Sequence, residues 1–257
     1  MTSEETEQLL NFCCEMGRQL IRNGAEIYRV EESARRILAA YGHQEAEVFA
    51  IPSCVILNIE DSVRNYTKSV RIRSSSNNLD KLDRLNSLCR RVCRETPPVA
   101  EAMAQLKAIA EEAGYPLWVS YLAYGFAASF FTLFWGGGAT DAALAFICGL
   151  AVKATVSSMS RLNANIFFTY ICASVLLAAI PTALACLRFP IHLDRVVIGT
   201  IMLLVPGLAI TNVMRDVISG DFLTAITKFA EVLIIAMAIA IGISIPIGAA
   251  RMLFGGF

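Results

Sequence analysis

Charged residues are scarce in the second part of this 257-residue chain. Of its 44 Lys, Arg, Asp and Glu residues, 32 lie before position 117 and only 12 after it. The N-terminus is acidic and lacks the apolar run that a secretory signal peptide needs. We therefore expect the first part of the chain to stay in the cytoplasm. The net charge is zero, which gives no indication of nucleic acid as a partner.

Motifs for metals, nucleotides and disulfides are lacking too. The eight cysteines contain no C-x-x-C, and the two histidines, His43 and His192, are far apart. Reduced cysteines then serve as small apolar side chains. No G-x-x-x-x-G-K-[ST] loop is present, which argues against direct coupling to ATP. We expect no metal and no cofactor.

Apolar residues, by contrast, make up 56% of the chain, and the mean hydropathy is +0.56. Runs of about 20 apolar residues after position 116 have the length needed to cross a bilayer. We predict that residues 115–257 form an α-helical transmembrane domain of about five helices. The predicted spans are about 117–135, 139–156, 164–186, 196–213 and 225–250.

The first 114 residues predict a small cytoplasmic α+β domain. Apolar residues recur at helical spacing over 4–23 and 26–41, with Asn23-Gly24 between them. Strand-like runs follow at 48–51, 54–59 and 66–73, with a turn at 60–62. Two more helices, about 79–95 and 99–113, complete the pattern, which is typical of helices packed on an antiparallel sheet.

Ionisable residues in or beside membrane spans cost about 2.5–3.5 kcal/mol at the bilayer centre, so they are functional candidates. Lys153 lies near the end of its span and could instead extend to the interface. Lys228 and Glu231 are three residues apart and could neutralise each other. Arg195 is interpreted as an interface anchor. The full set is Asp141, Lys153, Asp194, Arg195, Arg215, Asp216, Lys228 and Glu231.

Residues 205–216 form the most informative segment. Pro206 lacks an N–H and Gly207 tolerates irregular backbone, so the fourth span is predicted to be broken there. Transporters use such breaks to present backbone groups and helix ends to substrates. Asn212 and Asp216 share one helical face. A simple proline kink is the alternative. Gly242, Pro246 and Gly248 in the last span indicate close helix packing or, alternatively, a second break.

Three stretches run in order through nearly the whole chain: Asn23-Gly24-Ala25-Glu26 with Arg29-Val30-Glu31; Gly137-Gly138-x-x-Asp141; and Pro206-Gly207 with Asn212, Arg215-Asp216 and Gly220-Asp221. With these three stretches the sequence resembles the threonine/serine exporter family of bacterial and fungal membrane proteins.

The resemblance implies export of small polar metabolites, either threonine and serine or succinate-type dicarboxylates, from a bacterial plasma (inner) membrane. It also implies that longer members carry a second hydrophobic half, whereas split members rely on a second small transmembrane subunit. Because this chain ends soon after its fifth predicted span, we expect the split type with such a partner; a homo-oligomer is the other possibility. The family's functional residues carry over as Glu26, Arg29 and Glu31 beside Gly24, and as Asp141, Asn212 and Asp216.

Physical chemistry gives these residues roles that remain hypotheses. Asp141 or Asp216 could bind a coupling proton, and Arg215 or Lys228 could attract a substrate carboxylate. Glu26 and Arg29, three apart on a helix, could equally form a plain surface ion pair.

Two other functions compete with transport. A membrane-anchored metabolite sensor or scaffold is the main alternative. An intramembrane enzyme is not expected, because Ile218-Ser219-Gly220-Asp221 lacks the first glycine of the G-x-G-D signature of intramembrane aspartyl proteases.

Overall fold

The computed structural model describes residues 2–60, 64–73 and 76–255. The chain divides into two compact units. The first unit contains residues 1–113 together with residues 211–227, and the second contains residues 114–210 and 228–257. A short stretch from late in the sequence therefore belongs with the N-terminal part.

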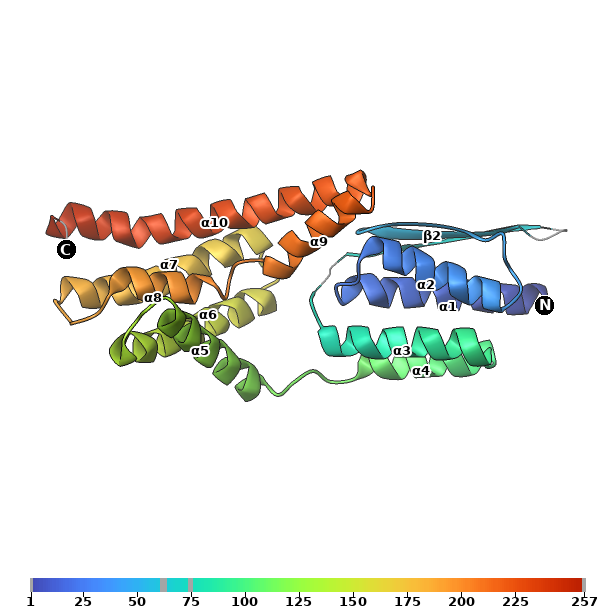
Figure 1. Cartoon of the computed structure of the whole chain (residues 1–257), viewed down its shortest axis with the longest axis horizontal. Helices are drawn as coiled ribbons and strands as arrows, with labels where there is room; N and C mark the ends of the chain where they lie inside the picture. Colours follow the sequence, from blue (N-terminus) through green and yellow to red (C-terminus); the bar gives the residue numbers. More distant parts are fainter. Residues whose placement is uncertain (1, 61–63, 74–75, 256–257) are drawn as a thin grey trace. The chain divides into compact units, whose positions relative to one another are not determined.

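The first unit is a small α+β structure (Figure 1). A three-stranded antiparallel sheet in the order β1-β2-β3 is flanked by helices. The predicted helices and strands are present, and the predicted turn at 60–62 lies mostly outside the described residues. The elements are α1 (Ser3–Arg22), α2 (Ile27–Ala40), β1 (Glu47–Ile51), β2 (Cys54–Glu60), β3 (Asn65–Arg71), α3 (Leu79–Glu95) and α4 (Val99–Glu111).

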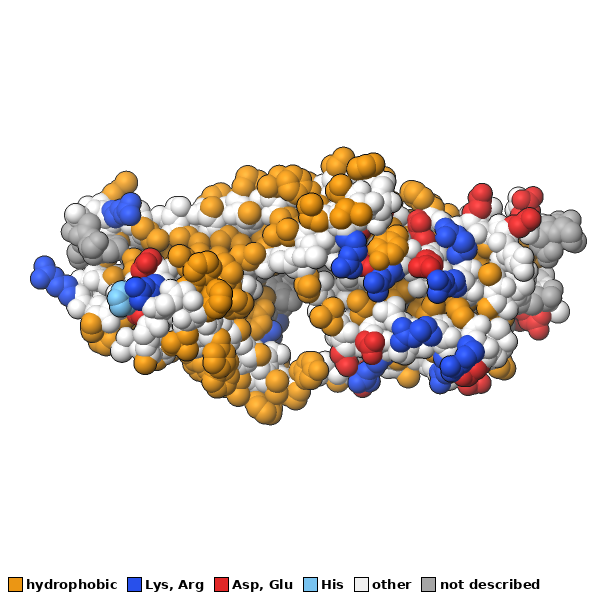
Figure 2. All heavy atoms as spheres, viewed as in Figure 1, with side chains coloured by type: hydrophobic (Ala, Val, Ile, Leu, Met, Phe, Trp, Pro, Cys, Tyr) orange, Lys and Arg blue, Asp and Glu red, His pale blue; other side chains and the backbone are white. Residues whose placement is uncertain are grey.

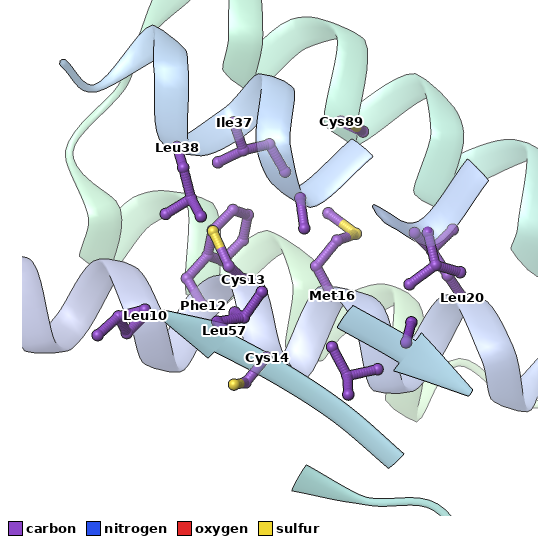
Figure 3. Packing of buried hydrophobic residues seen from close by; sticks show 14 of the residues in the cluster. Leu10, Phe12, Cys13, Cys14, Met16, Leu20, Ile37, Leu38, Leu57 and Cys89 are labelled. Atoms are coloured by element: carbon purple, nitrogen blue, oxygen red, sulfur yellow. The ribbon is translucent and has the colours of Figure 1, made fainter. Parts of the chain in front are cut away.

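The core of the first unit is formed by α1, α2 and the sheet together with side chains of α3 and α4. Strand β2 alternates strictly, with Val55, Leu57 and Ile59 buried, because successive side chains of a strand point to opposite faces. Figure 3 shows side chains of α1, among them Phe12 and Met16, gathered with those of α2 and β2. This packing fixes the end of α1 and the start of α2, where the family motif lies.

The second unit is made of apolar helices. They are α5 (Leu117–Phe134), α6 (Ala139–Arg161), α7 (Ile166–Cys186), α8 (Leu193–Ile201), the start of α9 (Gly207–Ile218) and most of α10 (Phe222–Phe254). On the face seen in Figure 2, apolar side chains cover much of the surface over these helices, whereas charged side chains gather over α1–α4. Such a surface fits a lipid environment.

The prediction of about five membrane helices is not confirmed. In the described part of the chain, four helices are long and apolar enough to cross a bilayer, namely α5, α6, α7 and α10. The predicted span 196–213 is instead two short helices, because α8 ends at Ile201 and α9 begins only at Gly207. Pro206 has no N–H to donate to a preceding turn, which accounts for the interruption.

Glycines allow several helices of the second unit to pack closely. A Cβ at Gly199 of α8 would lie 2.6 Å from the backbone nitrogen of Thr132 on α5. A Cβ at Gly242 of α10 would lie 2.7 Å from the carbonyl oxygen of Ile171 on α7. Because α10 continues unbroken past Pro246, the second break is not present. The packing interpretation holds for Gly242 and not for Gly248, since nothing lies within 4 Å of a Cβ built at Gly248.

Candidate functional site

The first unit holds a buried carboxylate between two arginines. Glu26 precedes α2 and is 7% exposed. Its carboxylate lies 2.6 Å from Nε of Arg29, one turn along the helix. The other oxygen of the same carboxylate pairs with a guanidinium nitrogen of Arg215, from α9. The Glu26–Arg29 pair expected from the spacing is present, and Arg215 adds a partner from a distant part of the sequence.

Two further residues of the α9 motif lie close to Arg215 in the sequence. Asp216, next to Arg215, is 1% exposed, and Asn212, one turn earlier, is half-buried. All three residues fall in the part of α9 that belongs to the first unit. The structure therefore brings Glu26, Arg29 and Arg215 together, and the neighbouring Asp216 is buried.

Gly24 and Glu31 shape the surroundings of Glu26. Gly24 has a φ of +94°, a conformation that disfavours residues with a Cβ, so the turn between α1 and α2 requires glycine. Glu31 accepts a hydrogen bond of 2.8 Å from the backbone N–H of Ala50 on β1. It thereby joins α2 to the sheet, which makes it a structural support for the helix that Glu26 precedes.

Asp141 forms a separate polar centre in the second unit. It is fully buried in the first turn of α6, and Oδ2 accepts a 2.8 Å hydrogen bond from the N–H of Gly138. Oδ1 accepts a 2.9 Å hydrogen bond from the N–H of His192, and Nδ1 of the same histidine lies 2.9 Å from Oδ2. The carboxylate therefore joins the start of α6 to the residue that precedes α8. A helix N-terminus favours such a negative charge.

The remaining candidates are dispersed. Pro206 and Gly207 stand at the interruption before α9. On α6, Nζ of Lys153 lies 5.0 Å from the centre of the Tyr124 ring, a cation–π geometry within one bundle. On α10, Lys228 is half-buried and Glu231 is exposed. We see no shared site for these residues and Asp141 in the described contacts.

Sequence reasoning missed two partners. For His192 the sequence indicates only that it is far from His43, yet it pairs with Asp141 across 51 positions. Arg215 was singled out as an attractor for substrate but not as the partner of Glu26. Both pairings join residues far apart in the chain, and no local spacing signals such contacts.

The four long apolar helices define the protein as an integral membrane protein. The model of the family described as "Putative threonine/serine exporter" matches residues 11–248. The chain belongs to this family, which is one of exporters rather than enzymes.

Curated relatives support the same assignment at low identity. Pheromone-regulated membrane protein 10 of Kluyveromyces lactis is 28% identical over 96% of this chain and 26% of its own length. The protein of that name in Saccharomyces cerevisiae is 26% identical over 91% of this chain and 31% of its own length. The threonine/serine exporter of Corynebacterium glutamicum is 23% identical over 95% of this chain and 52% of its own length.

The chain thus spans about a quarter to a half of the length of the curated relatives it matches. No solved structure matches it.

Proposed function

We propose that the chain is one component of a secondary exporter of small polar metabolites, either amino acids of the threonine and serine type or succinate-type dicarboxylates. The observation that carries the proposal is the family match over residues 11–248, which covers both the α+β unit and the apolar helices. The interruption between α8 and α9 adds a physical argument, because backbone freed from helical hydrogen bonds can bind a polar solute within a membrane.

In this proposal Arg215 attracts the substrate carboxylate, and Asp141 or Asp216 binds a coupling proton; Lys228 is the second cation available for the substrate. Because Arg215 is already paired with Glu26, substrate would have to compete with that carboxylate. Glu26 then acts as a latch, which holds Arg215 until an anionic group displaces it. The N-terminal unit faces the cytoplasm of a bacterium, and the apolar helices lie in its plasma membrane.

A second small transmembrane subunit of the same family completes the transporter in this proposal. The Corynebacterium exporter is about twice as long as the region that this chain matches, so the matched region is about half of that exporter. A separate subunit or a second copy of this chain could supply the other half.

Transport by the purified protein tests the proposal directly. The chain, alone and with the second subunit, is placed in proteoliposomes with a proton gradient, and efflux of labelled threonine, serine and succinate is measured. Efflux that requires both proteins supports the two-component exporter. If Asp141→Asn and Asp216→Asn both leave proton-driven efflux unchanged, the proposed proton sites are wrong; if no efflux occurs under any combination, the exporter proposal fails.

A membrane-anchored metabolite sensor is the second candidate. The compact α+β unit, with its own core, favours it because such a unit can bind a ligand without any transport. An anchor alone would not require the interrupted helix. Efflux from proteoliposomes distinguishes the two functions, since a sensor would bind metabolite and move none.

A further inference from the structure

A polar groove of about 730 Å³ runs along one face of α1 in the first unit. Its opposite wall is formed by α4, and the segment before α3 closes one end. The lining is polar and carries charges of both signs, in contrast to the apolar core on the other side of α1. A groove of this size can enclose a small metabolite.

Two of the four cations that line the groove have neither an ion-pair partner nor a side-chain hydrogen bond among the described residues. Arg18 pairs with Glu15 at 2.6 Å, and Nζ of Lys81 donates to the carbonyl oxygen of Ala110 at 2.8 Å. Arg22 and Lys107 also line the groove, yet neither forms an ion pair within the described part of the chain.

One carboxylate of the groove likewise has no ion-pair partner among the described residues. Glu111 lines the groove beside α4's last turn and has no ion pair among the residues described. The amides of Gln19 and Asn23 also line the groove, although the two residues are only 8% and 7% exposed, and Nε2 of Gln19 donates to the carboxylate of Glu15 at 2.8 Å. Asn23 keeps its place by donating a 2.7 Å hydrogen bond to the carbonyl oxygen of Gln19.

We propose that this groove is a binding site for a small zwitterionic metabolite of the α-amino-acid class. Arg22 and Lys107 receive the carboxylate, Glu111 receives the ammonium group, and the amides bind a polar side chain. Of the charged groove residues that form neither an ion pair nor a side-chain hydrogen bond among the described residues, Arg22 and Lys107 are cations and Glu111 is an anion. A zwitterion can therefore pair with both signs, whereas the second carboxylate of a dianion would face Glu111 and a dication would face the two cations.

The groove is connected to the Glu26 latch through a few residues. The N–H of Ser76 donates to the carbonyl oxygen of Arg22 at 2.8 Å, and the N–H of Asn78 donates to that of Asn23 at 3.2 Å. Asn23 leads through the turn at Gly24 to Glu26, which holds Arg215. A ligand that shifts Arg22 therefore also shifts the turn at Gly24, and with it Glu26, which holds Arg215. This regulatory step rests on the proposed export function, since it makes the cytoplasmic unit a sensor of exported solute.

Calorimetric titration of the purified full chain in detergent, without the second subunit, tests the groove. The probes are L-threonine and L-serine, with succinate and putrescine as the dianionic and dicationic comparisons. We expect the amino acids to bind and both comparison compounds to bind at least about ten-fold more weakly. Arg22→Gln and Lys107→Gln should each weaken threonine binding about ten-fold or more, because each removes a charge-assisted hydrogen bond. Arg91→Gln, an exposed arginine of α3 outside the groove lining, is the matched control and should bind normally.

Hydrogen exchange locates the ligand independently of affinity. Threonine should slow exchange in peptides covering residues 19–26 and 76–81, and Arg22→Gln should abolish that protection. Threonine binding that is unchanged in both groove variants, or absent in the wild type, would overturn the groove proposal while leaving the efflux result as it stands. Groove-dependent binding without any efflux would support the groove and overturn the exporter function.

Discussion

Glu26 and Arg215 pair within one compact unit, although one precedes the second helix of the chain and the other lies in the ninth. The Glu26 side chain is 9% exposed, whereas the Arg215 side chain is 46% exposed. A buried carboxylate that loses one of its two cations keeps its desolvation cost and loses part of its compensation. The pair is therefore both a structural link and the part of the site most sensitive to charge.

The first prediction concerns the coupling between these two residues. Glu26→Gln and Arg215→Gln should each destabilise the first unit by about 1–3 kcal/mol, and the double variant should cost less than the sum by about 1 kcal/mol or more. Chemical and thermal unfolding of the purified full chain measures this. The exposed Arg36–Glu32 pair, at 2.6 Å on one helix, is the control and should couple by less than about 0.5 kcal/mol. Equal coupling in both pairs would contradict a special role for the buried carboxylate.

The second prediction separates backbone strain from collision at the turn before Glu26. Gly24 and Gly42 both have positive φ, at +94° and +99°, but only Gly24 has a close neighbour, with Oδ1 of Asn77 2.6 Å from a built Cβ. Gly42→Ala should cost about 1–2 kcal/mol from conformation alone, and Gly24→Ala should cost more. Adding Asn77→Ala to Gly24→Ala should bring its cost down to that of Gly42→Ala. Unfolding experiments compare the free energy of unfolding of the wild type, the two single glycine variants and the double variant. If Asn77→Ala does not restore stability to Gly24→Ala, the collision is unimportant.

The third prediction concerns helix contacts in the apolar unit. A Cβ at Gly199 would lie 2.1 Å from Oγ1 and 2.6 Å from the backbone nitrogen of Thr132, so Gly199→Ala must move backbone. At Gly125 the obstacle is only the Phe146 ring, at 2.6 Å. Each alanine should lower stability by about 1–3 kcal/mol or more. Phe146→Leu should partly rescue Gly125→Ala, whereas Thr132→Ala should not rescue Gly199→Ala.

Gly248→Ala is the control for this series, because nothing lies within 4 Å of a Cβ built there. It should leave the midpoint of thermal unfolding of the purified protein nearly unchanged. A loss of stability in Gly248→Ala as large as that in Gly199→Ala would argue that helix propensity or lipid contact, rather than close approach, governs these positions.

The fourth prediction concerns a thiol pair on α3. A hydrogen bond with the Cys93 thiol is the main cause that lowers the pKa of Cys89 to about 7, against the opposing effect of burial, and Ser33, Arg36 and Arg90 lower it further. The thiolate of Cys89 should therefore form as the pH rises through about 7, below the usual range of a cysteine. Alkylation of this cysteine, followed by mass spectrometry of the purified chain, should rise over that interval.

Removal of the donor tests the cause. Cys93→Ala should raise the pKa of Cys89 and slow its alkylation at pH 7 several-fold. Cys13, whose pKa is raised well above its usual value by burial, should stay unlabelled under the same conditions and serves as the internal reference. An alkylation rate of Cys89 that does not respond to Cys93→Ala would contradict the assigned cause.

Local sequence signals predicted much of the architecture. The strand pattern that buries Val55, Leu57 and Ile59 and the helical spacing of α1 are periodic features that only require neighbours in the chain. Pro206 likewise marks the interruption before α9, because the missing N–H is a property of that residue alone.

Long-range partners could not be predicted in the same way. The spacing of Glu26 and Arg29 indicated their pair, but nothing near either residue indicates Arg215. His192 meets Asp141 only because α5 to α8 pack together, which is a property of the folded bundle. The number of membrane helices could not be predicted from local hydropathy either. Hydropathy indicated one span at 196–213, where the backbone forms two short helices.

The first unit is built from two separate parts of the chain, residues 1–113 and 211–227. This has a practical consequence for any attempt to study the unit in isolation. A fragment cut at residue 113 would contain the whole sheet and its flanking helices, yet it would leave Glu26 with Arg29 as the remaining member of its ion-pair cluster. A dissected version would thus need the loop and helix around Arg215 grafted back, for example through a short linker after α4. Affinities or stabilities measured on the bare fragment would describe a protein whose charge balance differs from that of the native one.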